Sequence, residues 1–149
     1  RRLVDAVRRD EVMLPLVVAG ATGWGELDLG GTDDVTFLGF VPDGDLAALY
    51  AAAAVFAYPS EREGFGLPVA EAMAQGTAVV TSAGTSTEEV AGGAAVLVDP
   101  FDVETIARGI AEAVERRDEL AVAGRRRAAE LDWAVAAERT LSVYRELVP

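Results

Sequence analysis

The sequence predicts an α/β fold in which a doubly wound parallel sheet has helices on both faces. Short apolar runs rich in β-branched residues alternate along the chain with segments of helical periodicity, the pattern of a parallel sheet crossed by helices. The 149 residues are enough for one domain with a hydrophobic core, and a hydrophobic content of 51% indicates a packed globule. Ligands of such sheets bind beyond the carboxyl ends of the strands, so we expect the site at the loops that leave those ends.

The first half of the chain predicts three strands and two helices. Each strand is a short apolar run with glycine or proline at one end or both. Asp43 or Asp45 is expected to cap the second helix, because a carboxylate there accepts hydrogen bonds from free N–H groups of the first turn. In chain order we expect a helix over residues 1–9, strands over 16–19 and 35–38, a helix ending near residue 53, and a strand over 54–58.

The second half predicts two more strands, over 78–81 and 95–98, and four helices. Pro68 suits the first position of a helix, where a missing N–H costs nothing, and Gly76 suits its C-terminal end. Asp102 and Asp132 are expected to cap two later helices, and another helix follows Asp118. The apolar faces of the two capped helices are Val103, Ile106, Ile110 and Val114 in one, and Trp133, Leu141 and Tyr144 in the other.

The composition narrows the chemistry. A formal net charge of −12 disfavours nucleic acid and anionic lipid as partners. The chain has no cysteine, which excludes disulfides and thiolate chemistry, and no histidine, which excludes histidine acid–base catalysis and imidazole zinc sites. No apolar run approaches the roughly 20 residues of a membrane-spanning helix. Carboxylates, backbone amides and arginine remain for any site.

The segment from Glu63 to Glu71 carries the strongest functional pattern. Four residues between the glutamates place backbone amides at or just before a helix start, where free N–H groups and the macrodipole attract an anion, most often phosphate. These residues are Gly64, Phe65, Gly66 and Leu67. Carboxylates accept hydrogen bonds from sugar hydroxyls, so the combination predicts a sugar-nucleotide site. The residues alone leave one alternative open: the segment is an ordinary turn between a strand and a helix, with Glu71 only solvated.

Three stretches of the chain carry a family resemblance: VTFLGFVPDGDLAALYAAA, FAYPSEREGFGLPVAEAMAQGTAVVTS and EEVAGGAAVLVDP. They resemble the donor-binding half of retaining, sugar-nucleotide-dependent glycosyltransferases, the large family that includes bacterial α-mannosyl- and α-glucosyltransferases. Glu63 and Glu71, separated by seven residues, match its E-x7-E signature. The resemblance implies a Rossmann-like domain over residues 1–149, the C-terminal half of a GT-B fold. It also implies transfer of a hexose from a nucleoside diphosphate to an acceptor hydroxyl with the α configuration retained.

The resemblance implies a role for each site residue. Glu63 would be the catalytic carboxylate nearest the donor sugar. The alternative is that Glu63, close to Glu61, is one of several charged residues exposed to solvent. Glu71 would bind the ribose hydroxyls, and the amides of residues 64–67 would bind the diphosphate. Phe40 and Val41 would offer backbone groups and an apolar wall to the nucleobase, or form a simple proline turn. The implied donor is a nucleotide sugar such as GDP-mannose, UDP-glucose or UDP-N-acetylglucosamine, with no cofactor and no metal.

The chain departs from the family pattern at its start. The family's basic pair, which grips the diphosphate, precedes the first helix, and Arg1 and Arg2 stand too far along to be that pair. We therefore expect the opening strand to be absent, together with an N-terminal domain that binds the acceptor, a glycan, lipid or small molecule. The chain alone is expected to fold, to bind nucleoside diphosphates weakly and to transfer no sugar. A cytoplasmic location, or a peripheral one at the inner face of a membrane, fits these expectations.

Several residues and the chain as a whole admit two interpretations. Thr81 and Ser82 either reach a phosphate or serve the structure. Trp133 and Tyr144 are expected to pack, and the arginines at 125–127 are expected on the exposed side of a helix or against an anionic membrane surface. For the whole chain, the alternatives to an enzyme domain are a non-catalytic or regulatory nucleotide-sugar-binding module and a plain interaction domain.

Overall fold

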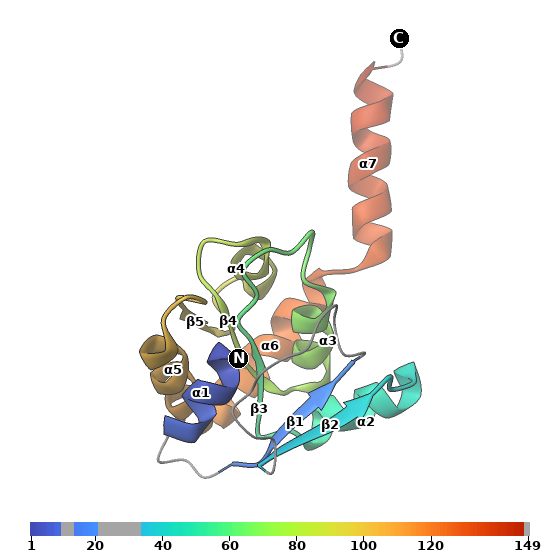
Figure 1. Cartoon of the computed structure of the whole chain (residues 1–149). Helices are drawn as coiled ribbons and strands as arrows, with labels where there is room; N and C mark the ends of the chain where they lie inside the picture. The colour runs from blue at the N-terminus through green and yellow to red at the C-terminus, as the bar shows by residue number, and fades with distance from the viewer. Residues whose placement is uncertain (10–13, 21–33, 148–149) are drawn as a thin grey trace.

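The computed structural model describes residues 1–9, 14–20 and 34–147. From β2 to α5 strands and helices alternate, and the helices α6 and α7 then end the described chain (Figure 1). The strands are β1 (Leu16–Ala19), β2 (Val35–Gly39), β3 (Val55–Tyr58), β4 (Ala78–Ser82) and β5 (Val96–Val98). The helices are α1 (Arg2–Arg9), α2 (Asp43–Ala52), α3 (Leu67–Gln75), α4 (Ser86–Ala91), α5 (Val103–Glu115), α6 (Arg117–Glu130) and α7 (Trp133–Leu147).

Every hydrogen-bonded strand pair of the described residues is parallel, which confirms the predicted α/β class. The expected single sheet is divided into two, however: β1 pairs with β2, and β3, β4 and β5 form a second sheet in that order. A small apolar hollow lies between the divided parts, with Leu16 of β1 on one side and Val55 and Ala57 of β3 on the other. Val7 of α1 and Ile110 of α5 also line it. Helix α1 packs on both sheets, because its Ala6 belongs to the cluster around β4 and its Val4 to the cluster with Val35 of β2.

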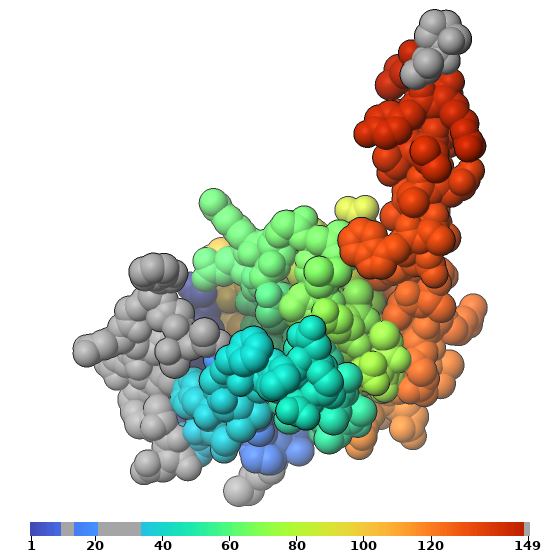
Figure 2. Space-filling model, turned by 90° about the vertical axis from the view of Figure 1, so that its right-hand side faces the viewer, coloured from blue at the N-terminus to red at the C-terminus, as the bar shows by residue number. Residues whose placement is uncertain are grey.

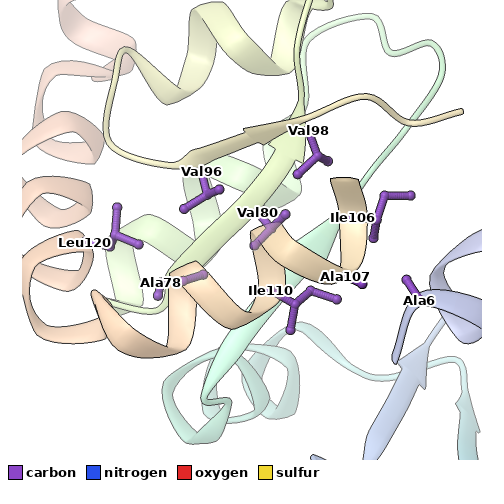
Figure 3. Close-up of a cluster of buried hydrophobic side chains, with 10 residues drawn as sticks. Ala6, Ala78, Val80, Val96, Val98, Ile106, Ala107, Ile110 and Leu120 are labelled. Carbon is purple, nitrogen blue, oxygen red and sulfur yellow. The ribbon is translucent and has the colours of Figure 1, made fainter. Parts of the chain in front are cut away.

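Helices cover both faces of the larger sheet, as the doubly wound arrangement requires. The central strand β4 is buried along its whole length, and its side chains alternate between the faces. Ala78 and Val80 point to the face covered by α1 and α5, where they meet residues such as Ile106 (Figure 3). Val79 points to the opposite face, where it packs in a cluster with Met73 of α3 and Tyr50 of α2. The loop that joins β3 to α3 begins beside this buried strand, because β3 pairs with β4.

The helix ends follow the predicted chemistry with one exception. Asp102 caps α5 by accepting from the N–H of Glu104 at 2.9 Å, and Asp132 accepts from the N–H of Ala134 before α7. Gly76 ends α3 in the left-handed conformation. The prediction that Asp43 or Asp45 caps α2 is wrong: the N-cap is Pro42, and both aspartates lie in the first helical turn. They still face the positive end of the helix dipole, so their charge remains favourable without a capping bond.

Two features of the helices differ from expectation: the sequence analysis does not predict the short helix α4, and Arg127 of α6 does not lie on the exposed side of its helix. Arg127 donates hydrogen bonds to the carbonyls of Glu89 and Val90 at the C-terminal end of α4, both at 2.9 Å. Arg127 is therefore half-buried rather than on the exposed side of its helix.

The last helix, α7, stands clear of the rest of the chain and buries none of its residues (Figures 1 and 2). The prediction that Trp133 and Tyr144 pack is wrong for this chain, because they are 82% and 61% exposed. Helical periodicity identifies an apolar face, but it does not supply a neighbour for that face. Within the described residues, no helix is long and apolar enough to cross a membrane.

Candidate functional site

The candidate site is built on the loop that joins β3 to α3, at the carboxyl end of β3. Gly66 ends the loop in the left-handed region, with φ of +102°, and acts as the N-cap of α3. A Cβ on Gly66 would lie 2.8 Å from Cγ2 of the buried Thr87, so both conformation and space require glycine there. Pro68 lies one residue inside the helix, where it needs no hydrogen-bond partner for its nitrogen.

The backbone amides before α3 are available to a ligand. Among the described residues, none accepts a hydrogen bond from the N–H groups of Gly64, Phe65, Gly66 or Leu67. They lie at the positive end of the α3 dipole, which favours an anion. A Cβ at Gly64 would meet nothing within 4 Å, so the fold does not require glycine at that position. The open space instead leaves room for a ligand against the backbone.

Glu63 is held in place by two hydroxyl groups. The Tyr58 hydroxyl at the end of β3 donates to Oε1 of Glu63 at 2.5 Å, and Oγ of Ser60 donates to the same oxygen at 3.0 Å. No described group makes a hydrogen bond or ion pair with Oε2, which is therefore open to a ligand. Burial, followed by the hydrogen bond to Glu63, raises the pKa of Tyr58 to about 12. Tyr58 is thus a neutral donor at physiological pH.

Glu71 lies one turn inside α3 with an exposed side chain. The hydroxyl of Tyr50, from α2, donates to its Oε2 at 3.2 Å. Burial and the nearby Glu71 charge both raise the pKa of Tyr50 above its ordinary value, so this phenol also stays neutral. Oε1 of Glu71 has no partner among the described residues and is open to a ligand.

A layer of hydroxyl groups beneath the loop fixes its backbone. Ser82, at the end of β4, donates to the carbonyl of Ser60 at 2.7 Å, and Ser86 of α4 donates to the carbonyl of Glu63 at 2.9 Å. Thr81 is fully buried, with its hydroxyl 3.0 Å from the Tyr58 carbonyl. Of the two interpretations of Thr81 and Ser82, the geometry favours the structural one, because both side chains are buried and bonded below the loop.

Phe40 and Val41 belong to a separate hollow. They follow β2 and line a shallow depression of about 460 Å³, together with Leu38, Pro42 and three residues of α2, Asp45, Ala48 and Leu49. Phe40 is 82% exposed, so its ring is free to contact a planar ligand. Among the described residues, no hydrogen bond, ion pair or ring contact joins Phe40 or Val41 to the Glu63 loop. The connection between the two places is α2, whose Tyr50 reaches Glu71.

The structure places both predicted carboxylates and the predicted amides around one loop, but the side chains that hold them are not among the predicted residues. Tyr50, Tyr58, Ser60 and Ser86 were not singled out, although all lie in or beside the stretches that carry the family resemblance. Ser60 was within reach of local reasoning, since it precedes Glu63 by three residues. Arg2 also lies beside the loop, where it pairs with Glu61 and stands over the ring of Phe101.

Comparisons with known proteins match most of this chain to one family. A family model described as glycosyl transferases group 1 matches residues 2–130. O-antigen chain mannosyltransferase B of Escherichia coli is 41% identical over 143 residues, which cover 89% of this chain and 38% of that protein. MMP alpha-(1->4)-mannosyltransferase of Mycolicibacterium hassiacum is 38% identical over 128 residues, which cover 81% of this chain and 31% of that protein.

Solved structures show the same fold. Sucrose-phosphate synthase from Thermosynechococcus elongatus superposes with a TM-score of 0.81 and 30% identity, over 98% of this chain and 41% of that one. Anabaena HepE, solved in complex with UDP and glucose, gives a TM-score of 0.81 at 23% identity, over 99% of this chain and 44% of that one. The chain thus spans less than half the length of these proteins. Its fold is the Rossmann-like, C-terminal domain of the GT-B architecture, and the chain belongs to the group 1 glycosyl transferases.

Proposed function

We propose that this domain binds a nucleoside-diphosphate sugar and, in the natural full-length protein, positions the sugar for retaining transfer to an acceptor hydroxyl. One observation carries the proposal: four amides at the start of α3 lie between Glu63 and Glu71, and within the described part of the chain these amides and one oxygen of each carboxylate have no hydrogen-bond partner. Amides suit the diphosphate, and carboxylates suit the hydroxyls of sugar and ribose. The names of the similar mannosyltransferases support the reaction class.

The proposed mechanism depends on stabilising the leaving group. As the bond between sugar and diphosphate breaks, negative charge grows on the diphosphate next to the α3 amides, whose direction is fixed by the hydroxyl layer below. Glu63 would orient the donor sugar through Oε2, and Glu71 would hold the ribose through Oε1. Phe40 and Val41 would give the nucleobase an apolar wall. In this proposal no step requires a metal ion.

Mannose is the first sugar to test, because two of the similar proteins are named mannosyltransferases. The HepE structure, which contains UDP and glucose, makes a glucose donor the second. GDP-mannose, UDP-glucose and UDP-N-acetylglucosamine therefore form the initial panel. The acceptor, a glycan, lipid or small molecule, would bind outside this domain.

The test measures release of UDP or GDP from each donor by the full-length protein, in EDTA and without acceptor. We expect slow release from one donor and strongly reduced release by Glu63→Ala. The matched control is Glu115→Ala, which removes an exposed carboxylate from the end of α5, far along the chain from the site. Absence of donor hydrolysis, together with absence of UDP or GDP binding in calorimetry, would refute the proposal. Binding without hydrolysis or transfer would favour the non-catalytic binding module instead.

A further inference from the structure

Each of the two signature carboxylates is bonded to a tyrosine that comes from the core of the domain. Tyr58 donates to Oε1 of Glu63 at 2.5 Å, and Tyr50 donates to Oε2 of Glu71 at 3.2 Å. In both glutamates the tyrosine occupies one oxygen, and the other has no partner among the described residues. This arrangement leaves an acceptor for a ligand on each carboxylate while the opposite oxygen is fixed.

The two tyrosines are parts of one aromatic stack. The ring of Tyr50 meets Phe56 edge-on, with centroids 5.1 Å apart and an interplanar angle of 85°. Phe56 in turn stacks on Tyr58 at 5.7 Å and 16°. Phe56 and Tyr58 are two residues apart on β3 and so share a face of the strand. Edge-to-face and stacked pairs of this kind are favourable, and here they connect the two hydroxyl donors.

The stack is anchored at the end that lies beneath α3. Tyr50 is only 7% exposed and packs against the cluster that contains Val69 and Met73 of α3. Its backbone carbonyl accepts from the hydroxyl of buried Thr77 at 2.5 Å. Glu71, by contrast, is exposed, and among the described residues only Tyr50 restrains its carboxylate. The rigid core therefore sets the position of a side chain that would otherwise sample several rotamers.

We propose that Tyr50 and Tyr58 are positioning residues, whose hydroxyl groups hold Glu71 and Glu63 in the orientations that bind ribose and donor sugar. The inference rests on the proposed function, since it assigns these orientations to a nucleotide sugar. Preorganised groups lose less freedom when the ligand arrives, which improves binding and turnover. Because each tyrosine serves a different carboxylate, the two hydroxyls have separable effects. Tyr50 affects nucleotide affinity, and Tyr58 affects turnover.

The experiment replaces each tyrosine by phenylalanine, which keeps the ring and the stack and removes only the hydroxyl. For Tyr50→Phe we expect about tenfold weaker binding of UDP or GDP in calorimetry, the effect of one hydrogen bond to a charged group at the low end of its range. For Tyr58→Phe in the full-length protein we expect about tenfold lower kcat with unchanged nucleotide affinity. Tyr144→Phe is the matched control, because it makes the same change on the exposed helix α7 and should alter neither quantity.

Double variants distinguish positioning from a merely structural role. If Tyr50 acts through Glu71, then Tyr50→Phe combined with Glu71→Ala, which removes the acceptor of the Tyr50 hydrogen bond, should bind no more weakly than Glu71→Ala alone. Additive losses, or full affinity in Tyr50→Phe when Glu71→Gln is impaired, would overturn the inference and leave the proposed function standing. Full affinity in Glu71→Gln itself would overturn the proposed role of Glu71 and the inference with it.

A second measurement tests the contacts without altering the tyrosines and covers the case of a phenylalanine variant that does not fold. Ultraviolet titration follows ionisation of the phenols in wild type, Glu63→Gln and Glu71→Gln. Removing the carboxylate charge should move the pKa of Tyr58, about 12 in the intact protein, toward its ordinary value in Glu63→Gln. The pKa of Tyr50 should fall likewise in Glu71→Gln. Unchanged titration curves in both variants would overturn the inference.

Discussion

Replacement of Glu71 by glutamine tests the nucleotide site most directly. The carboxylate is exposed, and among the described residues its one protein partner is Tyr50, at 3.2 Å. In the proposed complex, Oε1 of the negatively charged Glu71 carboxylate accepts a hydrogen bond from a ribose hydroxyl. Hydrogen bonds to charged groups contribute about 1.5–3 kcal/mol, so the loss should weaken UDP or GDP binding about 10- to 150-fold.

The same substitution should have little effect on folding. Glutamine keeps an oxygen that accepts the Tyr50 hydrogen, so the change replaces a charged acceptor by a neutral one at a partly exposed contact. The expected cost in the free energy of unfolding is therefore at most about 1 kcal/mol. Chemical denaturation of wild type and variant measures this difference.

Calorimetric titration with UDP and GDP is the assay, and Glu115→Gln is the matched control. The control removes the same charge from an exposed position at the end of α5, so it reports any general effect of lowering the net negative charge. Wild-type affinity in the control and a large loss in Glu71→Gln are expected. Equal affinity in wild type and Glu71→Gln would refute the assignment of Glu71 to the ribose.

Three more predictions address the loop and its tyrosines. In the full-length protein, Glu63→Ala should lower kcat far more than affinity for UDP or GDP, because this carboxylate would contact the sugar alone; a raised KM with unchanged kcat would make Glu63 a binding residue only. Gly66→Ala should destabilise the fold by about 1–3 kcal/mol, because Gly66 has a positive φ and an added Cβ would lie 2.8 Å from Cγ2 of Thr87. Gly64→Ala should instead unfold like wild type and bind the nucleotide sugar more weakly, because an added Cβ there meets no protein atom within 4 Å. Urea denaturation with calorimetry separates the two glycines, and equal stability losses would contradict this division. At alkaline pH, the pKa of Tyr58 is higher in the native state than in the unfolded state, so the native state keeps the phenol proton after the unfolded state has lost it. The contribution of Tyr58 to stability is therefore complete below pH 10 and falls as the pH rises to about 12. Thermal unfolding between pH 9 and 12 should show a steeper fall in Tm for wild type than for Tyr58→Phe, and parallel curves would contradict this linkage.

Features that depend on neighbouring residues in the chain were predictable from sequence. The cap at Asp102, the left-handed end at Gly76 and the amides before α3 all follow from chemistry within a few residues. The helix α4 was missed because six residues are too few to show a helical period. The exposed Trp133 was misjudged because an apolar stripe says nothing about what covers it.

The candidate site divides in the same way. The groups that would contact the sugar, diphosphate and ribose lie within nine residues, from Glu63 to Glu71, so their chemistry can be predicted from one segment. Of the groups that position them, Tyr58 and Ser60 are local, whereas Tyr50 precedes Glu71 by 21 residues and Ser86 follows Glu63 by 23. Such partners can be identified only when the pairing of β3 with β4 and the packing of α2 on α3 are known. The chemistry of this site is therefore encoded locally, whereas its geometry is a property of the folded core.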